Sequence, residues 1–535
     1  MKSRGVALGT RGMVASANTL VSSTGLQILR NGGNAMDAAI AMALTSSVVL
    51  PDMCGLGGDA FFLYYDAKNK KVFSLNGSGP AGKNYSQEYY KNKKLSKIPE
   101  TGIDSISIPG AVSVFFEGLK RFGTFSFEKC CQDAIFLAEN GYPCSEKTSS
   151  YISKKIDLIK IDEALSKMLL DNQNHAKKPF DLIYNKPLAR TFNYLSENGE
   201  TGFYNHLAPK FVTYLNNRGA AFETSDFSDY HCTEEVPLNI NYRNKLIYQL
   251  APVSQGIIHL EILNILNQTD ISKMERNKAE LIHLMVEAKK IAFEDRINYF
   301  GDPKFVKNPI TELLSSEYGK KVYDSIDLKK SSIIKNNLYD HESGHTTSMV
   351  VVDSNGNACS FIHSISDVFG SGIMEPETGV IFNNRLGTGF NLMEGHPNCV
   401  APGKKTMHTL NTYLITDLDN NCIYVGNTPG GDNQPQWNTQ TVVNLIDFGL
   451  DIQEAIEEPR WFDAQSTNPF SKTVENILTL ESKIDEEVVK ELAEKGHQVL
   501  VIDQCGGASQ LIQIKGKGHY LGASDPRANG CAIGY

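Results

Sequence analysis

The sequence predicts an α+β protein in which β-strands pack beneath α-helices. In the part of the chain before residue 301 the apolar residues recur mainly at helical spacing. After residue 346 the pattern changes to short strand-like runs separated by turns of Gly, Asn and Asp. The 535 residues contain no repeat of fixed period, and they are enough for two or more domains or for one large layered core.

Helices are expected in six segments, the first of which contains a helix start. Asn34 is a good N-cap with Asp37 three residues later, and Gly32 and Gly33 break the element before it. The Lys-rich segment 150–195 is expected to form surface helices. The charges of segment 278–300 are expected to form a solvated face opposite an apolar one. The segments are 20–50, 110–140, 150–195 (Lys-rich), 278–300, 434–448 and 451–458.

Strand-like runs cover 349–353, 358–365, 411–416, 421–427 and 497–503. The first two are joined by the sequence DSNG at 353–356, which is typical of a type I turn closed by a left-handed Gly. A three-residue loop of this kind places Thr346 directly opposite Ser364. A two-residue Asn-Gly turn would place Ser364 opposite Thr347 instead. Either register brings a second hydroxyl group next to the Thr pair.

The Thr pair follows a polar stretch, 330–345, that is expected to be exposed and cleavable. If the chain were cut between His345 and Thr346, Thr346 would carry both a hydroxyl nucleophile and a free α-amine to act as its base. An ordinary loop that leads into a strand is the simpler interpretation of this stretch taken alone.

Two Gly-rich turns differ in their context. The turn at 55–59 precedes a strand, which is the wrong order for a dinucleotide-binding motif, so it is expected to be a tight turn close to other backbone. The turn at 428–432 follows a strand and precedes a helix. There the backbone N–H groups of Gly430 and Gly431 are suited to an anion or to the oxyanion of acyl transfer, with a structural loop as the alternative.

Composition excludes several classes of partner. The formal net charge is −9, which argues against nucleic acid or an anionic membrane as the main partner. No apolar block is long enough for a signal peptide or a membrane span, which favours a cytoplasmic protein. The ten Cys residues show no CxxC pairs or ligand-spaced His, so they are expected to be reduced and buried, with no metal site.

Eight motifs along the chain resemble, in order and essentially from end to end, those of the γ-glutamyltranspeptidase family of N-terminal-nucleophile hydrolases. They are GGNAMDAA at 32–39, SQG at 254–256, VEAKK at 286–290, GHTT at 344–347, FGSGI at 369–373, NN at 383–384, PGG at 429–431 and GASDPR at 522–527.

The resemblance implies an αββα sandwich, made as one precursor that cuts itself before Thr346. The products would be a large chain of residues 1–345 and a small chain of residues 346–535, which form a heterodimer. It also implies that Thr346 attacks an amide carbonyl, that Gly430 and Gly431 hold the oxyanion, and that Ser364 supports the nucleophile. No metal or organic cofactor is required.

The residues that would recognise a γ-glutamyl group depart from the family pattern. Typical members follow the Asn-Asn pair with Gln-Met-Asp-Asp-Phe, whose second Asp binds the α-ammonium group, whereas Arg385 follows Asn384 here. The Ser-Ser pair that binds the α-carboxylate aligns with His408 and Thr409, and the large-chain Arg falls near Tyr85. The residues expected to contact the substrate are Arg385, Asn384, His408, Thr409, Ser366 and Tyr85.

Arg385 suggests a different substrate, because a guanidinium group can bind a carboxylate through two hydrogen bonds. The alternative is that Arg385 bonds backbone or a structural carboxylate. The pattern, including residues 431–436, resembles the acylase and oxamate amidohydrolase branch, which implies a small carboxylate-bearing amide, oxamate-like or glutaryl-like. Two other hypotheses stay open: a hydrolase or transferase of glutathione-like γ-glutamyl amides, and an unprocessed, inactive binding protein.

Overall fold

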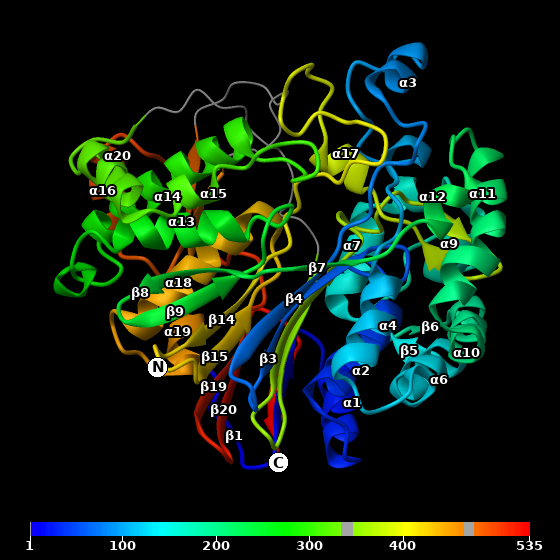
Figure 1. Ribbon diagram of the computed structural model, residues 1–535, viewed down its shortest axis with the longest axis horizontal. Helices are drawn as coiled ribbons and strands as arrows, with labels where there is room; N and C mark the ends of the chain where they lie inside the picture. Colours follow the sequence, from blue (N-terminus) through cyan, green and yellow to red (C-terminus); the bar gives the residue numbers. More distant parts are fainter. Residues whose placement is uncertain (1, 333–345, 465–475) are drawn as a thin grey trace.

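Two seven-stranded sheets are stacked on one another, and helices cover the outer face of each (Figure 1). The computed structural model describes residues 2–332, 346–464 and 476–535. Helices α1, α2 and α4 lie on one side of the strands, and α13, α14, α18 and α19 lie on the other. The predicted α+β fold, an αββα sandwich, is confirmed.

The first sheet is antiparallel and combines strands from both ends of the chain. Its central pair, β10 and β11, is flanked on one side by strands from the N- and C-termini and on the other by strands from the first half of the sequence. The order is β21 (Cys531–Gly534), β2 (Met13–Ser16), β10 (Thr347–Val352), β11 (Ala358–Ser364), β3 (Asp59–Asp66), β4 (Lys71–Gly77) and β7 (Thr233–Glu235).

The second sheet also mixes early and late segments. Its order is β1 (Ala7–Gly9), β20 (His519–Ser524), β19 (Gln510–Gly516), β15 (Cys422–Asn427), β14 (Thr412–Thr416), β9 (Lys245–Gln249) and β8 (Leu238–Tyr242). A small third sheet contains β16 (Trp461–Asp463), β17 (Ile477–Glu481) and β18 (Gln498–Ile502). The five predicted strands correspond to β10, β11, β14, β15 and β18.

The helices against the first sheet begin as the sequence predicts. The Asn34 side chain accepts hydrogen bonds from the N–H groups of Met36 and Asp37, and Asp37 bonds back to the Asn34 N–H, which completes a capping box. The helices of this layer are α1 (Thr19–Arg30), α2 (Ala35–Val49), α4 (Ala111–Phe122), α5 (Phe127–Cys130), α6 (Gln132–Asn140) and α10 (Lys186–Thr201).

The helix layer on the second sheet corrects one expectation. Glu287, Lys289 and Lys290 of α14 are buried, so the predicted solvated face of 278–300 is wrong. Because α13 and α20 pack against α14, its charges pair with other buried groups instead of meeting water. This layer contains α13 (Gly256–Leu266), α14 (Ala279–Tyr299), α16 (Ser316–Ser325), α18 (Gln434–Ile446), α19 (Ile452–Glu457) and α20 (Glu486–Glu494).

Short elements complete the chain around these layers. The helices are α3 (Gln87–Asn92), α7 (Glu146–Lys154), α8 (Ile156–Ile159), α9 (Glu163–Leu169), α11 (Ala208–Asn216), α12 (Thr224–Ser228), α15 (Ile310–Leu313) and α17 (Arg385–Gly389). Two small hairpins pair β5 (Tyr142–Pro143) with β6 (Leu182–Ile183) and β12 (Met374–Glu375) with β13 (Val380–Ile381). No helix in the described ranges is both long and apolar enough to cross a membrane.

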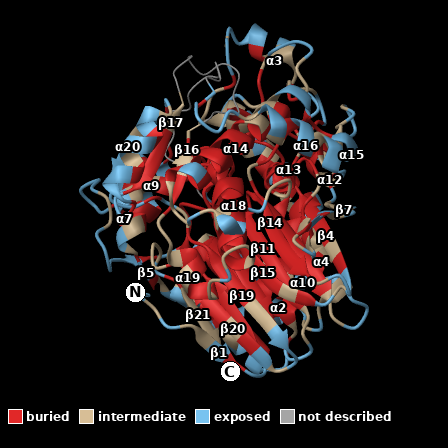
Figure 2. Cartoon of the chain, turned by 90° about the vertical axis from the view of Figure 1, so that its left-hand side faces the viewer, coloured by how far each residue is buried: buried red, intermediate tan, exposed pale blue. Residues whose placement is uncertain are grey.

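Three apolar clusters fill the spaces between the four layers, which Figure 2 shows as a largely buried interior. Alternate residues of β10 belong to different clusters. Met349 and Val351 pack towards the helices of the first layer, whereas Val350 and Val352 pack between the two sheets. Both faces of β10 are therefore buried, and its register decides which side chain enters which space.

The register is the one that a three-residue turn predicts. Thr347 pairs with His363, and the Asp353 N–H donates to the Asn357 carbonyl oxygen over 3.0 Å. Continued by one residue, this register sets Thr346 opposite Ser364 and excludes the alternative in which Ser364 faces Thr347. The predicted cleavage partner His345 lies outside the described residues.

Replacement of Asn34 by Ala should lower the free energy of unfolding by about 1 kcal/mol, because two N–H groups at the start of a fully buried helix lose their acceptor. Chemical denaturation followed by circular dichroism measures the change. Asn92→Ala, at the exposed end of α3, is the matched control and should leave the midpoint unchanged. Equal midpoints for the two variants would contradict the capping role.

Candidate active site

Three polar side chains form a row across the first sheet. Thr346 precedes β10 and lies opposite Ser364, the last residue of β11, and Ser364 pairs with Asp59, the first residue of β3. Successive side chains of a strand point to opposite faces of the sheet, and Thr346 is an even number of residues from Val350, which packs between the sheets. The row therefore projects into that space. Neighbouring strands are about 4.8 Å apart, so Asp59 lies roughly 10 Å from Thr346.

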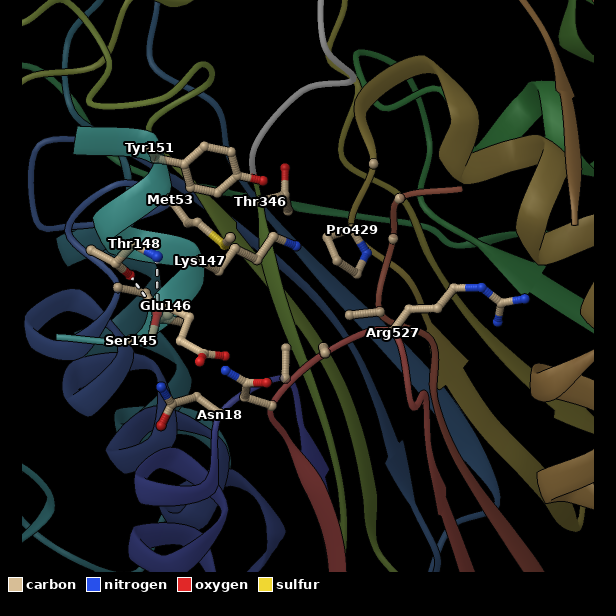
Figure 3. Close-up of a pocket in the computed structure, with 18 residues that line it drawn as sticks. Asn18, Met53, Ser145, Glu146, Lys147, Thr148, Tyr151, Thr346, Pro429 and Arg527 are labelled. Carbon is tan, nitrogen blue, oxygen red and sulfur yellow. Dashed lines mark hydrogen bonds between the residues drawn. The ribbon is translucent and has the colours of Figure 1, made fainter. Parts of the chain in front are cut away.

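Thr346 borders a pocket of about 260 Å³ (Figure 3). One wall is the first turn and a half of α7, residues 145–148 and Tyr151. The opposite wall is made by three loops, 429–430, 506–508 and 527–529, and residues 17–18, 50 and 53 complete the lining. Although Thr346 is only 2% exposed, its side chain is accessible from this pocket.

The turn between β15 and α18 has the conformation that only glycine adopts readily. Gly430 has φ 138° and Gly431 φ 55°, and a Cβ atom on Gly430 would lie 2.2 Å from the Trp437 ring. Within the described part of the chain, neither backbone N–H group donates a hydrogen bond. Gly430 and Thr346 line the same pocket, so the Gly430 N–H group is placed where it could donate to an anion beside Thr346.

A buried polar chain holds this turn in place. Gln255 Nε2 donates to the Gly431 carbonyl oxygen over 2.8 Å, and Gln255 Oε1 accepts from Arg296 Nη1 over 2.6 Å. Arg296 Nη1 also lies 2.8 Å from Asp432 Oδ1. Gln255, just before α13, and Arg296 of α14 thus support the turn from behind.

Arg385 and His408 meet at one carboxylate, that of Asp59. Arg385 Nε and His408 Nε2 each lie 3.1 Å from Asp59 Oδ2, while Asp59 Oδ1 accepts from the Gly79 N–H over 3.0 Å. All three side chains are buried. Burial by itself would raise the pKa of Asp59, but His408 and Arg385 hold that pKa below its usual value. Burial, with Arg385, lowers the pKa of His408 to about 4, so His408 is neutral at pH 7 and donates to Asp59.

Ser366 and Asn384 surround the end of β11. Ser364 Oγ accepts from the Ser366 N–H over 2.8 Å, and Ser366 Oγ lies 2.6 Å from Thr388 Oγ1. Asn384 Oδ1 accepts from the Asp367 N–H over 3.0 Å. The Gly58 turn packs on the same point, because a Cβ atom there would lie 2.2 Å from the Ser364 carbonyl oxygen. The turn at 55–59 is thus close to other backbone, as predicted.

Thr409 and Tyr85 lie in different surroundings. The Thr409 carbonyl oxygen accepts from Gln255 Nε2, next to the Gly431 turn. Tyr85 is fully buried in an aromatic cluster, with its ring centroid 4.8 Å from that of Phe222. Neither residue lines the Thr346 pocket. Whether the predicted residues contact substrate stays a prediction.

Sequence reasoning missed the α7 wall of the pocket. Residues 145–148 lie between the predicted segments 110–140 and 150–195, and Tyr151 lies at the start of the Lys-rich one, whose amphipathic pattern is typical of surface helices. Neither stretch shows by its pattern that Lys147 and Tyr151 point towards Thr346. It also missed the role of Asp59, which was visible only as the end of a Gly-rich turn. The loops at 506–508 and 527–529 reach the pocket through tertiary packing alone.

One cluster resembles a metal site by its residue types. Among the described residues, His283, Glu287 and His497 place potential ligand atoms within 4.8 Å of one another. Glu287 Oε1, however, accepts from Lys290 Nζ over 2.7 Å, and Glu287 Oε2 accepts from the Ser332 N–H over 3.0 Å. These contacts assign the cluster a structural role: it fastens the chain just before residue 333.

Comparison with known proteins identifies a family and a fold. A family model described as Gamma-glutamyltranspeptidase matches residues 21–535. A glutathione hydrolase-like proenzyme of Bacillus subtilis is 34% identical over 98% of this chain and 99% of its own, and an oxamate amidohydrolase proenzyme of Klebsiella pneumoniae is 32% identical over 99% of both. The crystal structure of cephalosporin acylase from Bacillus halodurans superposes with a TM-score of 0.90 at 29% identity, covering 100% of this chain and 98% of that chain.

Asp59→Asn should lower the free energy of unfolding by about 3–5 kcal/mol, because it leaves the buried Arg385 guanidinium without its carboxylate. Denaturant titration of the purified protein measures the loss. Asp229→Asn, which removes an exposed partner of Lys83, is the control and should hardly move the midpoint. If both variants unfold at the wild-type midpoint, the buried cluster does not support the fold.

Proposed function

We propose that this chain, which belongs to the gamma-glutamyltranspeptidase family, is a self-processing amidohydrolase that forms an acyl-enzyme on Thr346. At the level of the family, the protein is an enzyme that hydrolyses or transfers amide bonds. The single observation that carries the finer proposal is the position of Thr346: it shares one pocket with Gly430, whose N–H group is free within the described residues.

The first proposed step is cleavage of the precursor between His345 and Thr346. It would free the α-amine of Thr346 and give chains of residues 1–345 and 346–535. Both sheets contain strands from either side of this bond: β2 beside β10 and β3 beside β11 in one sheet, and β9 beside β14 in the other. The two chains would therefore stay paired as a heterodimer after the cut. The similar proteins from B. subtilis and K. pneumoniae are both named proenzymes.

In the proposed reaction the Thr346 hydroxyl attacks the carbonyl carbon of the substrate amide. Its proton passes to the α-amine of Thr346, while Gly430 and Gly431 donate to the oxyanion. The C–N bond then breaks, and the leaving amine takes the proton. Water attacks the resulting ester and restores the hydroxyl group. Ser364, opposite Thr346 in the ladder, supports the nucleophile.

For the substrate we favour a small amide that carries a carboxylate, oxamate-like or glutaryl-like. The similarity to an oxamate amidohydrolase supports it, as does the cation Arg385 where typical family members bind an ammonium group with an anion. The alternative is a γ-glutamyl amide, which the similarity to a glutathione hydrolase-like protein favours. The second alternative, an unprocessed binding protein, predicts a single uncut chain. Arg385 already bonds Asp59, so its part in substrate binding needs a direct test.

Thr346→Ala should abolish processing and lower amide hydrolysis by about 10⁴-fold or more, because it removes the nucleophile. Denaturing electrophoresis should show two fragments for the wild type and one full-length band for the variant. Thr347→Ala is the matched control, since the Thr347 hydroxyl is buried and has no partner among the described residues. A single full-length band in active wild-type protein would overturn the self-processing enzyme.

A hydrolysis panel on the processed protein identifies the acyl group. We expect higher kcat/KM for oxamate or for a glutaryl anilide than for the γ-glutamyl anilide of the same amine. The reason is that no acidic residue follows Asn384 to bind the α-ammonium group. Butyryl anilide is the uncharged control. A clear preference for the γ-glutamyl substrate would favour the glutathione hydrolase alternative.

A further inference from the structure

The side chain of Lys147 enters the Thr346 pocket from the first turn of α7. Figure 3 shows its ammonium group between Thr346 and Pro429, with the Tyr151 ring on the same side. Lys147 Nζ lies 5.9 Å from the centroid of that ring. Among the described residues, Lys147 forms no ion pair and no hydrogen bond through its ammonium group.

The other charges of the pocket are engaged elsewhere or point away. Arg527 points out of the pocket and bonds Glu481 and Asp525. The Glu146 carboxylate lies lower in the pocket, towards Asn18, and away from Thr346. Lys147 is thus the cation that faces the nucleophile within the described lining.

The acids near Lys147 do not neutralise it by direct contact. Burial lowers the pKa of Lys147, and the more distant Asp52 and Asp525 partly oppose this effect. Asp52 Oδ1 accepts from the Thr148 hydroxyl over 3.1 Å, and Asp525 pairs with Arg460 and Arg527. A half-buried ammonium group without a direct partner is costly, and an anionic ligand in the pocket would offset that cost.

We infer that Lys147 binds a carboxylate of the substrate beside Thr346 and so determines which amides the enzyme accepts. The inference rests on the proposed function and deepens it. A pocket of about 260 Å³ suits a small acid of a few carbon atoms. Arg385, by contrast, is held by Asp59 about two strand spacings from the nucleophile. The carboxylate can belong to the acyl group or to the leaving amine, and the substrates below distinguish these sources.

The test compares Lys147→Met, Lys147→Arg and Arg385→Gln in the processed enzyme. Glutaryl 4-nitroanilide carries a carboxylate on its acyl group. The butyryl amide of 4-aminobenzoate carries one on its leaving amine. Butyryl 4-nitroanilide is the uncharged substrate. Lys147→Met should raise the KM of one of the charged substrates about 10-fold or more. The KM of the uncharged substrate should change less than about twofold. Lys147→Arg should restore part of the loss. Lys120→Met, on the exposed surface of α4, is the control.

Three results would overturn the inference. The first is that Lys147→Met lowers kcat/KM equally for charged and uncharged substrates. The second is that Lys147→Met lowers kcat alone, which would place Lys147 at the Thr346 amine. The third is that KM changes in Arg385→Gln only. Free glutarate and free 4-aminobenzoate give a test without variants: at least one of them should inhibit wild-type hydrolysis of the uncharged amide competitively, and the absence of inhibition by both would refute the inference. Failure of the wild type to cut itself or to hydrolyse any of the amides would instead count against the proposed function.

Discussion

The register between β10 and β11 is the constraint on which the rest of the site depends. Both faces of the pair are buried, so a slip by one residue would move apolar side chains such as Val350 into the helix layer and Met349 between the sheets. The three-residue turn sets this register, and the flanking strands β2 and β3 reinforce it. The same register places Thr346 and Ser364 side by side, facing the second sheet. The position of the nucleophile is thus a consequence of packing throughout the sheet.

Polar contacts between the sheets bring the second half of the site to this point. Asn427, at the end of β15, donates to the Met349 carbonyl oxygen over 3.0 Å and to Ser360 Oγ over 2.9 Å. The Gly430–Gly431 turn begins just after Asn427, so the contacts that join the sheets also determine where the free N–H groups lie. A buried carboxylate at Asp59 and a buried guanidinium at Arg296 support the site from two other directions. Such pairs add little net stability, but they leave few alternative arrangements of the loops that they join.

The pocket itself is formed by segments that lie far apart in the sequence. Its walls come from α7 and from loops near residues 430, 507 and 528. Of the residues that the family pattern suggested for substrate binding, Arg385 and His408 lie at the Asp59 end of the row, whereas the ammonium group of Lys147 lies beside Thr346. Different layers thus supply the two groups: the first sheet positions Thr346, and the outer helix α7 supplies the cation next to it.

The sequence by itself determined the features that depend on neighbouring residues. The Asn34 cap, the 353–356 turn with its register, and the Gly-rich turn between β15 and α18 all follow from local chemistry, and together with the motifs they indicate the fold and the candidate nucleophile. Only the tertiary structure decided the environment of the charges. Neither the burial of the α14 charges nor the contact of Arg385 with Asp59 can be read from periodicity, because Arg296, Lys289 and Arg385 bond partners 136, 174 and 326 residues away. The same holds for Lys147, which lies beside Thr346 on a helix whose first turn is held by a hydrogen bond from Thr148 to Asp52, 96 residues away.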